Sequence, residues 1–70
     1  MLKIKDNVDL KELEKNYKDI IVYPSVYRDF YLFINKDRSI EIPVDYGSII
    51  NELDTLYDLI KDGLVEKVEK

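Results

Sequence analysis

The sequence predicts an α+β protein, with a small antiparallel sheet of three to four strands and two helices packed on one face. Two segments, near residues 10–17 and 49–62, carry apolar side chains at helical spacing. Between them lie short runs rich in β-branched and aromatic residues, which polar turns separate as in antiparallel sheets. Because the chain has 70 residues and no linker, repeat or low-complexity segment, we expect a single α+β domain over residues 1–70, in the order β-α-β-β-β-α-β.

The N-terminal part predicts a short strand followed by a capped helix. Residues 2–4 alternate between apolar and charged side chains, which is typical of a strand. Asp9 can cap the next segment, and Glu12, three residues later, can reach back to the amide of the cap. The helix is expected to end near residues 16–18.

The middle of the chain sorts its side chains by parity. Between Ile20 and Asn35 most even positions are apolar and lack a hydroxyl, whereas three of the odd positions are tyrosines. Because neighbouring residues of a strand face opposite sides, this pattern predicts one aliphatic face in the core and one tyrosine-rich face. Pro24 interrupts the run, so we expect two strands, near residues 20–23 and 30–34.

The tyrosine-rich face is a candidate protein interface, because tyrosine combines a large contact area with a polar tip. Its residues are Tyr23, Tyr27, Tyr31 and Phe33. Ordinary sheet packing is the alternative interpretation, since aromatic residues are common in strands. Both interpretations stay open.

A hairpin is expected after the second of these strands. The polar turn at residues 35–39 joins residues 30–34 to the alternating run at 40–44. Pro43 cannot donate to a strand ladder, so this third strand is expected at an edge or to end there.

A second helix and a short strand complete the expected fold. Ser48 can cap a helix that runs to about Asp62, and Gly63 suits the left-handed residue that follows a helix. A strand near residues 65–68 closes the chain. The predicted core collects the inward apolar positions of all these elements: Leu10, Leu13, Val22, Phe30, Leu32, Ile34, Ile40, Ile42, Ile49, Leu53, Leu56, Ile60 and Leu64.

The composition argues against enzymatic chemistry and against a bound metal or cofactor. The chain has no Cys and no His, so it lacks disulfides and the usual zinc ligands. Its serines have no base nearby in the sequence, and two glycines cannot build a phosphate-binding loop. We therefore expect no enzyme, no cofactor and no metal. Since the N-terminus has no signal-peptide pattern and no run suits a membrane helix, we expect a cytoplasmic protein without membrane contact.

The net charge of −4 is concentrated in residues 45–63. Asp54, Asp58 and Asp62 recur every four residues and stack on one helix face, which we name the acidic ridge. A solvated face is the plain interpretation. The sharper interpretation is a mimic of nucleic-acid phosphates that binds a nucleic-acid-binding protein.

A winged-helix interpretation is weaker. Residues 53–68 are similar to the recognition helix and first wing strand of winged-helix DNA-binding regulators. The acidic side chains of this helix would repel phosphate, so direct nucleic-acid binding is not expected.

The two ends of the chain, Asn7–Glu14 and Leu56–Val68, resemble the ends of small uncharacterised proteins encoded by phages and prophages of low-GC Gram-positive bacteria. The resemblance implies a bacterial cytosol and an accessory role, and it assigns no site residue. The leading hypothesis is a non-catalytic protein-interaction module, a phage or prophage accessory protein whose partner is unknown and which can self-associate. An acidic nucleic-acid-mimicking inhibitor is the alternative, and a winged-helix-like regulator is the second alternative.

Overall fold

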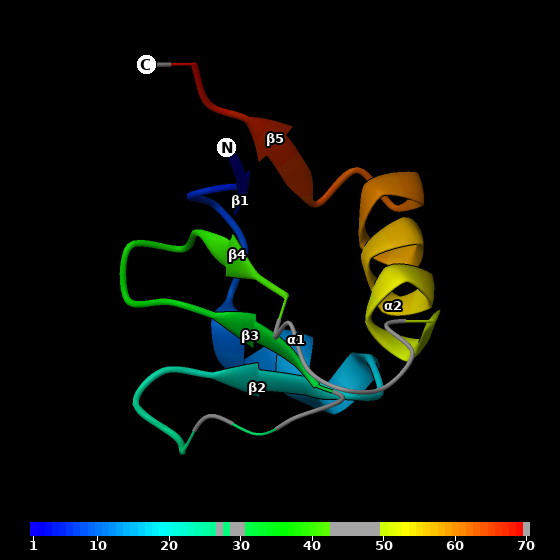
Figure 1. Cartoon of the computed structure of the whole chain (residues 1–70). Coiled ribbons are helices and arrows are strands. Elements are labelled where there is room, and N and C mark those ends of the chain that lie inside the picture. The colour runs from blue at the N-terminus through cyan, green and yellow to red at the C-terminus, as the bar shows by residue number, and fades with distance from the viewer. Residues whose placement is uncertain (27, 29–30, 43–49, 70) are drawn as a thin grey trace.

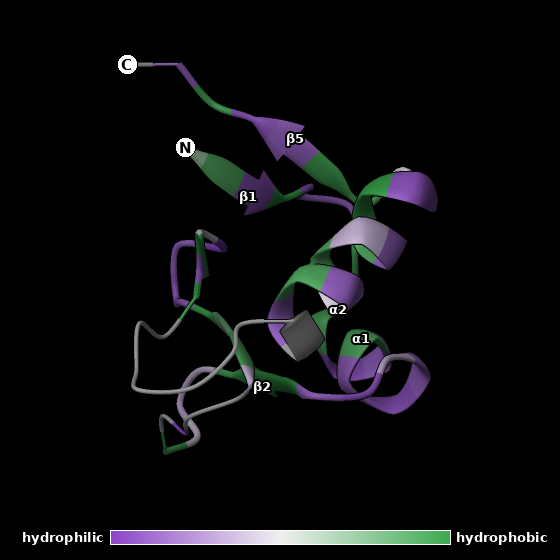
Figure 2. Ribbon diagram, turned by 45° about the vertical axis from the view of Figure 1, so that its right-hand side comes forward, coloured by the Kyte–Doolittle hydropathy of each residue, from purple (hydrophilic) through white to green (hydrophobic). Residues whose placement is uncertain are grey.

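The computed structural model describes residues 1–26, 28, 31–42 and 50–69, with the side chains of residues 50 and 51 left out. The α+β class and the element order are confirmed (Figure 1). The elements are β1 (Leu2–Ile4), α1 (Leu10–Asn16), β2 (Ile20–Val22), β3 (Leu32–Ile34), β4 (Ile40–Glu41), α2 (Ile50–Lys61) and β5 (Val65–Lys67). In the view of Figure 2, both helices lie to one side of the strands.

The described strands form two sheets, one of β2, β3 and β4 and one of β1 and β5. The predicted hairpin is confirmed, because β3 and β4 pair antiparallel with Ile34 opposite Ile40. A bridge between Lys3 and Ser39 joins the two sheets through β1. The backbone amide of Ile4 donates to the carbonyl of Arg38 at 2.9 Å beside this bridge.

One pairing differs from the prediction of an antiparallel sheet. β2 and β3 run parallel, with Ile20 opposite Leu32 and Val22 opposite Ile34. A parallel pair needs a connection that carries the chain back along the strand. Strands of three residues are only about 10 Å long, so the segment 23–31 is long enough for this return.

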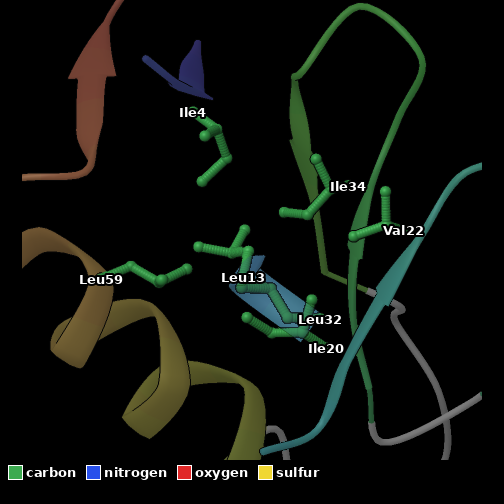
Figure 3. Close-up of a cluster of buried hydrophobic side chains, with 7 residues drawn as sticks. All are labelled: Ile4, Leu13, Ile20, Val22, Leu32, Ile34 and Leu59. Atoms are coloured by element: carbon green, nitrogen blue, oxygen red, sulfur yellow. The ribbon is translucent and has the colours of Figure 1, made fainter. Parts of the chain in front are cut away.

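The core lies between the helices and the strands (Figure 3). α1 packs on β2, while α2 contacts β3 and β5. Seven buried apolar side chains from five elements point toward one another: Ile4, Leu13, Ile20, Val22, Leu32, Ile34 and Leu59. Four of the predicted core residues are among the buried ones, and five more pack against them: Leu10, Ile40, Ile42, Leu56 and Leu64.

Two predicted core residues are wrong, since Leu53 and Ile60 are exposed. The cause is the orientation of α2, which turns Leu59 rather than its neighbour Ile60 into the core. Phe30 and Ile49 lie outside the described residues. Ile20 is a core residue, as the parity pattern predicted for the aliphatic face, although it was not among the predicted core residues. Ile4 and Leu59 are core residues that were not predicted.

The helix ends follow the sequence where the structure describes them. Asp9 caps α1, and its Oδ1 accepts from the amide of Lys11 at 2.9 Å. Glu12 was expected to reach back to this cap, and its carboxylate lies 3.8 Å from Lys15 Nζ. After α2, Gly63 has a φ of 76°, and the amide of Leu64 donates to the carbonyl of Leu59 at 3.0 Å, as in a Schellman motif. The predicted cap Ser48 lies outside the described residues.

Candidate functional site

α2 presents three large apolar side chains to solvent. Leu53 is 45% exposed, Tyr57 63% and Ile60 50%. Because residues three and four apart are neighbours on a helix surface, these three form one stripe along two turns. We name them the apolar stripe.

The face of α2 that packs against the core includes two polar residues. Among residues 52–61 of α2, the buried ones are Glu52, Thr55 and Leu59. The Thr55 hydroxyl donates to the carbonyl of Lys18 at 3.2 Å, which joins α2 to the chain after α1. Glu52 is 1% exposed, and its Oε1 has no hydrogen-bond partner among the described residues.

The buried face is therefore displaced by one residue from the expected apolar seam. Of the seam predicted at positions 53, 56 and 60, Leu56 packs against the core, whereas Leu53 and Ile60 would point inward only if α2 turned by about 100°, the rotation of one residue. Burial of an unpaired carboxylate oxygen disfavours folding, and exposure of the stripe forgoes apolar burial. α2 is thus arranged at the expense of the stability of the isolated chain.

The acidic ridge lies on the other flank of the buried face. Asp54, Asp58 and Asp62 are exposed and line a groove of about 460 Å³ together with residues 16–19, which follow α1. Lys18 and Lys61 also line this groove, so its charge is partly balanced.

Tyr17 lines this groove and forms a hydrogen bond to the acidic ridge. Its hydroxyl donates to Asp62 Oδ2. This hydrogen bond, with smaller effects of desolvation and of the charges of Asp62 and Asp58, raises the pKa of Tyr17 to about 12. Within the described part of the chain, no group of three His, Cys, Asp or Glu residues is arranged to hold a metal ion.

The structure does not gather the predicted tyrosine-rich face into one surface. Tyr23 is half exposed and borders a shallow hollow beside residues 35–39, whereas Tyr31 is half-buried and borders another hollow with Ile21 and Arg28. Tyr27 lies outside the described residues.

Phe33, the fourth residue of that face, is only 7% exposed. Ile21, its neighbour across the parallel pair, is buried as well. Both faces of β2 and β3 are therefore covered, as is usual for parallel strands. Phe33 therefore offers little accessible surface to a partner.

The turn between β3 and β4 is held by side chains that sequence reasoning treated as plain turn residues. Arg38 has a positive φ of 72°, and its guanidinium donates to the carbonyls of Lys5 and Val8, each at 2.8 Å. Hydrogen bonds from the Ser39 hydroxyl and amide lower the pKa of Asp37. These contacts are structural and tie the hairpin to the start of the chain.

A comparison with protein-family models, with curated proteins and with solved structures found no match. No helix in the described part of the chain is long and apolar enough to cross a membrane. The candidate site consequently rests on the geometry of α2 alone. It was missed because Leu53 and Ile60 were assigned to an inward seam, whereas Leu59 occupies the core in their place.

Proposed function

We propose that this chain is a non-catalytic protein-interaction module whose contact surface is the apolar stripe of α2. The observation that carries the proposal is the exposure of Leu53, Tyr57 and Ile60 on a helix that buries Glu52 and Thr55. A partner that covers the stripe would recover the apolar burial that the isolated chain forgoes.

The chemistry of the stripe supports this role. Helices dock into grooves or onto other helices through apolar residues at positions i, i+4 and i+7, which is the spacing of Leu53, Tyr57 and Ile60. Tyr57 adds a polar tip to an aromatic ring, a combination enriched at interfaces. The sheet tyrosines support the role less well, because Phe33 is buried and Tyr23 and Tyr31 border separate hollows.

The cellular setting is part of the same proposal. The resemblance of both ends of the chain to phage and prophage proteins supports an accessory role in a bacterial cytoplasm. A catalytic role has little support, because the chain offers no His or Cys and the groove beside α2 is lined mainly by carboxylates and lysines.

The acidic ridge supports a second candidate, an inhibitor that mimics nucleic acid. Asp54 and Asp58 are exposed on one helix face, and Asp19 extends their negative charge across the groove. The same charges disfavour a winged-helix role, since α2 would repel phosphate. Inhibition through the ridge would fall when Asp54 and Asp58 become Asn, and it would weaken steeply with salt.

Site-specific photocrosslinking separates these surfaces. A photoreactive phenylalanine analogue is placed at Leu53 or Ile60 for the stripe, at Asp58 for the ridge, and at Tyr23 as an exposed control. The proposed function predicts protein adducts from positions 53 and 60 that the control does not give. Adducts confined to position 58 would favour the acidic ridge as the interface. Adducts confined to position 23 would favour the predicted tyrosine-rich face of the sheet.

A further inference from the structure

The apolar stripe has a symmetric layout along α2. Leu53 and Ile60 are seven residues apart, and Tyr57 lies between them at a spacing of four and three. This is the spacing of the inward positions of a two-helix coiled coil, here over about two turns. The stripe can therefore meet a copy of itself with Tyr57 at the centre.

Two opposite charges flank the stripe on the same side. Asp54 and Lys61 are also seven residues apart, and each follows a stripe residue directly. Both side chains are exposed, and neither forms an ion pair within the described residues. Such flanking positions select the partner and the orientation in helix pairs.

An antiparallel pair of α2 helices satisfies both patterns at once. Reversal of the second helix about Tyr57 places Leu53 opposite Ile60 and brings Asp54 opposite Lys61, twice by symmetry. In a parallel pair, each flank of one stripe faces the other flank of the second stripe. Asp54 and Lys61 lie on the same flank, so they would not face each other. We propose, building on the stripe as the interaction surface, that its occupant is α2 of a second copy of this chain, packed antiparallel in a twofold-symmetric dimer.

The size of the stripe sets the expected strength of this dimer. Three half-exposed side chains cover far less than the roughly 800 Å² per partner of a typical stable interface, so we expect a dissociation constant of about 0.1 mM. The association would therefore respond to protein concentration. It also fits a chain too small to bury a large core alone.

Thiol crosslinking tests the geometry, because the natural chain has no Cys and each variant carries a single thiol. Tyr57→Cys should form a disulfide-linked dimer at least tenfold faster than Tyr23→Cys, a control at a tyrosine that is also exposed. A mixture of Leu53→Cys and Ile60→Cys should give the mixed disulfide in preference to either homodimer. Equal rates for positions 57 and 23, or homodimers as the main products, would overturn the antiparallel pair.

Charge exchange tests whether the occupant is a second copy. In sedimentation equilibrium at up to 1 mM, Asp54→Lys and Lys61→Asp should each raise the dissociation constant at least threefold. Mixing the two variants should restore association, because every facing pair is then opposite in charge. Asp58→Lys is the control on the ridge and should leave association unchanged, while circular dichroism verifies the fold of each variant.

The outcomes separate this inference from the proposed function. A parent chain that stays monomeric at 1 mM while position 53 crosslinks to a different protein refutes the dimer and leaves the interaction module standing. A monomeric chain without any adduct from the stripe refutes both. Failure of the mixed charge variants to associate, when the parent chain dimerises, also overturns the proposed pairing.

Discussion

Replacement of Glu52 by leucine should stabilise the isolated chain, which is unusual for a substitution at a buried position. The side chain is almost fully buried in the first turn of α2. Its Oε1 has no hydrogen-bond partner among the residues that the structure describes. Leucine has a similar length and carries no group that needs a partner.

The magnitude follows from three contributions. A buried acceptor without a partner costs about 1–3 kcal/mol, and a charged one costs more. Loss of an acidic side chain from the first turn of a helix removes about 0.3–1 kcal/mol of favourable interaction with the helix dipole. Glutamate and leucine have nearly equal helix propensities, so this contribution is small. The expected net gain is about 1–2 kcal/mol in the free energy of unfolding for Glu52→Leu.

Urea denaturation monitored by circular dichroism measures this change. The protein concentration should be a few micromolar, since dimer formation would add to the apparent stability. Glu14→Leu on the exposed face of α1 is the matched control, and its effect should stay within about 0.5 kcal/mol. A loss of more than about 2 kcal/mol for Glu52→Leu would show that the carboxylate is paired and would refute the reasoning.

Three further predictions test the described contacts. Leu59→Ala should lower the free energy of unfolding by about 2–5 kcal/mol in urea titrations, whereas the exposed Leu53→Ala should cost less than about 1 kcal/mol; equal losses would contradict the orientation of α2. The hydrogen bond from Tyr17 to Asp62 raises the pKa of Tyr17 to about 12, so it stabilises the folded state fully below pH 10. The parent chain should have a free energy of unfolding about 1 kcal/mol higher than that of Tyr17→Phe, after allowance for solvent screening, and this difference should disappear as the pH rises from 10 to 12. A difference that is constant with pH would exclude this bond as its source. Arg38→Lys should lower the melting temperature through loss of about 2 kcal/mol, because the shorter lysine does not place its nitrogen where Arg38 Nη1 donates to both carbonyls. An unchanged melting temperature would show that the two bonds contribute nothing.

Local signals in the sequence were sufficient for the element order. The cap at Asp9, the left-handed Gly63 and the polar turn before β4 each act over a few residues, and the structure places all of them as expected. Such signals depend on backbone geometry and nearby side chains, so they are readable without knowledge of the tertiary fold.

The direction of β2 relative to β3 required tertiary information. Ile20–Val22 and Leu32–Ile34 are continuous apolar runs, and every residue in both is buried. Continuous apolar runs are typical of parallel strands that are covered on both faces. The prediction from parity assumed instead that one face of the sheet is exposed to solvent. The predicted alternation depended on tyrosines that lie outside these two strands. The strands themselves do not alternate between apolar and polar residues.

The orientation of α2 is the point at which fold and proposed function meet. Its apolar residues cover more of the helix circumference than one packing face needs, so the sequence alone permits several inward faces. The double variant Glu52→Leu with Leu53→Glu keeps the composition and net charge of the chain but moves an apolar residue from the stripe into the core face. We expect this variant to unfold at higher urea concentration and to lose the association that the stripe supports, as measured by denaturation and by sedimentation on the same samples. Greater stability with unchanged association would show that Leu53 does not contribute to a contact with a partner. The apolar stripe would then not be an interaction surface.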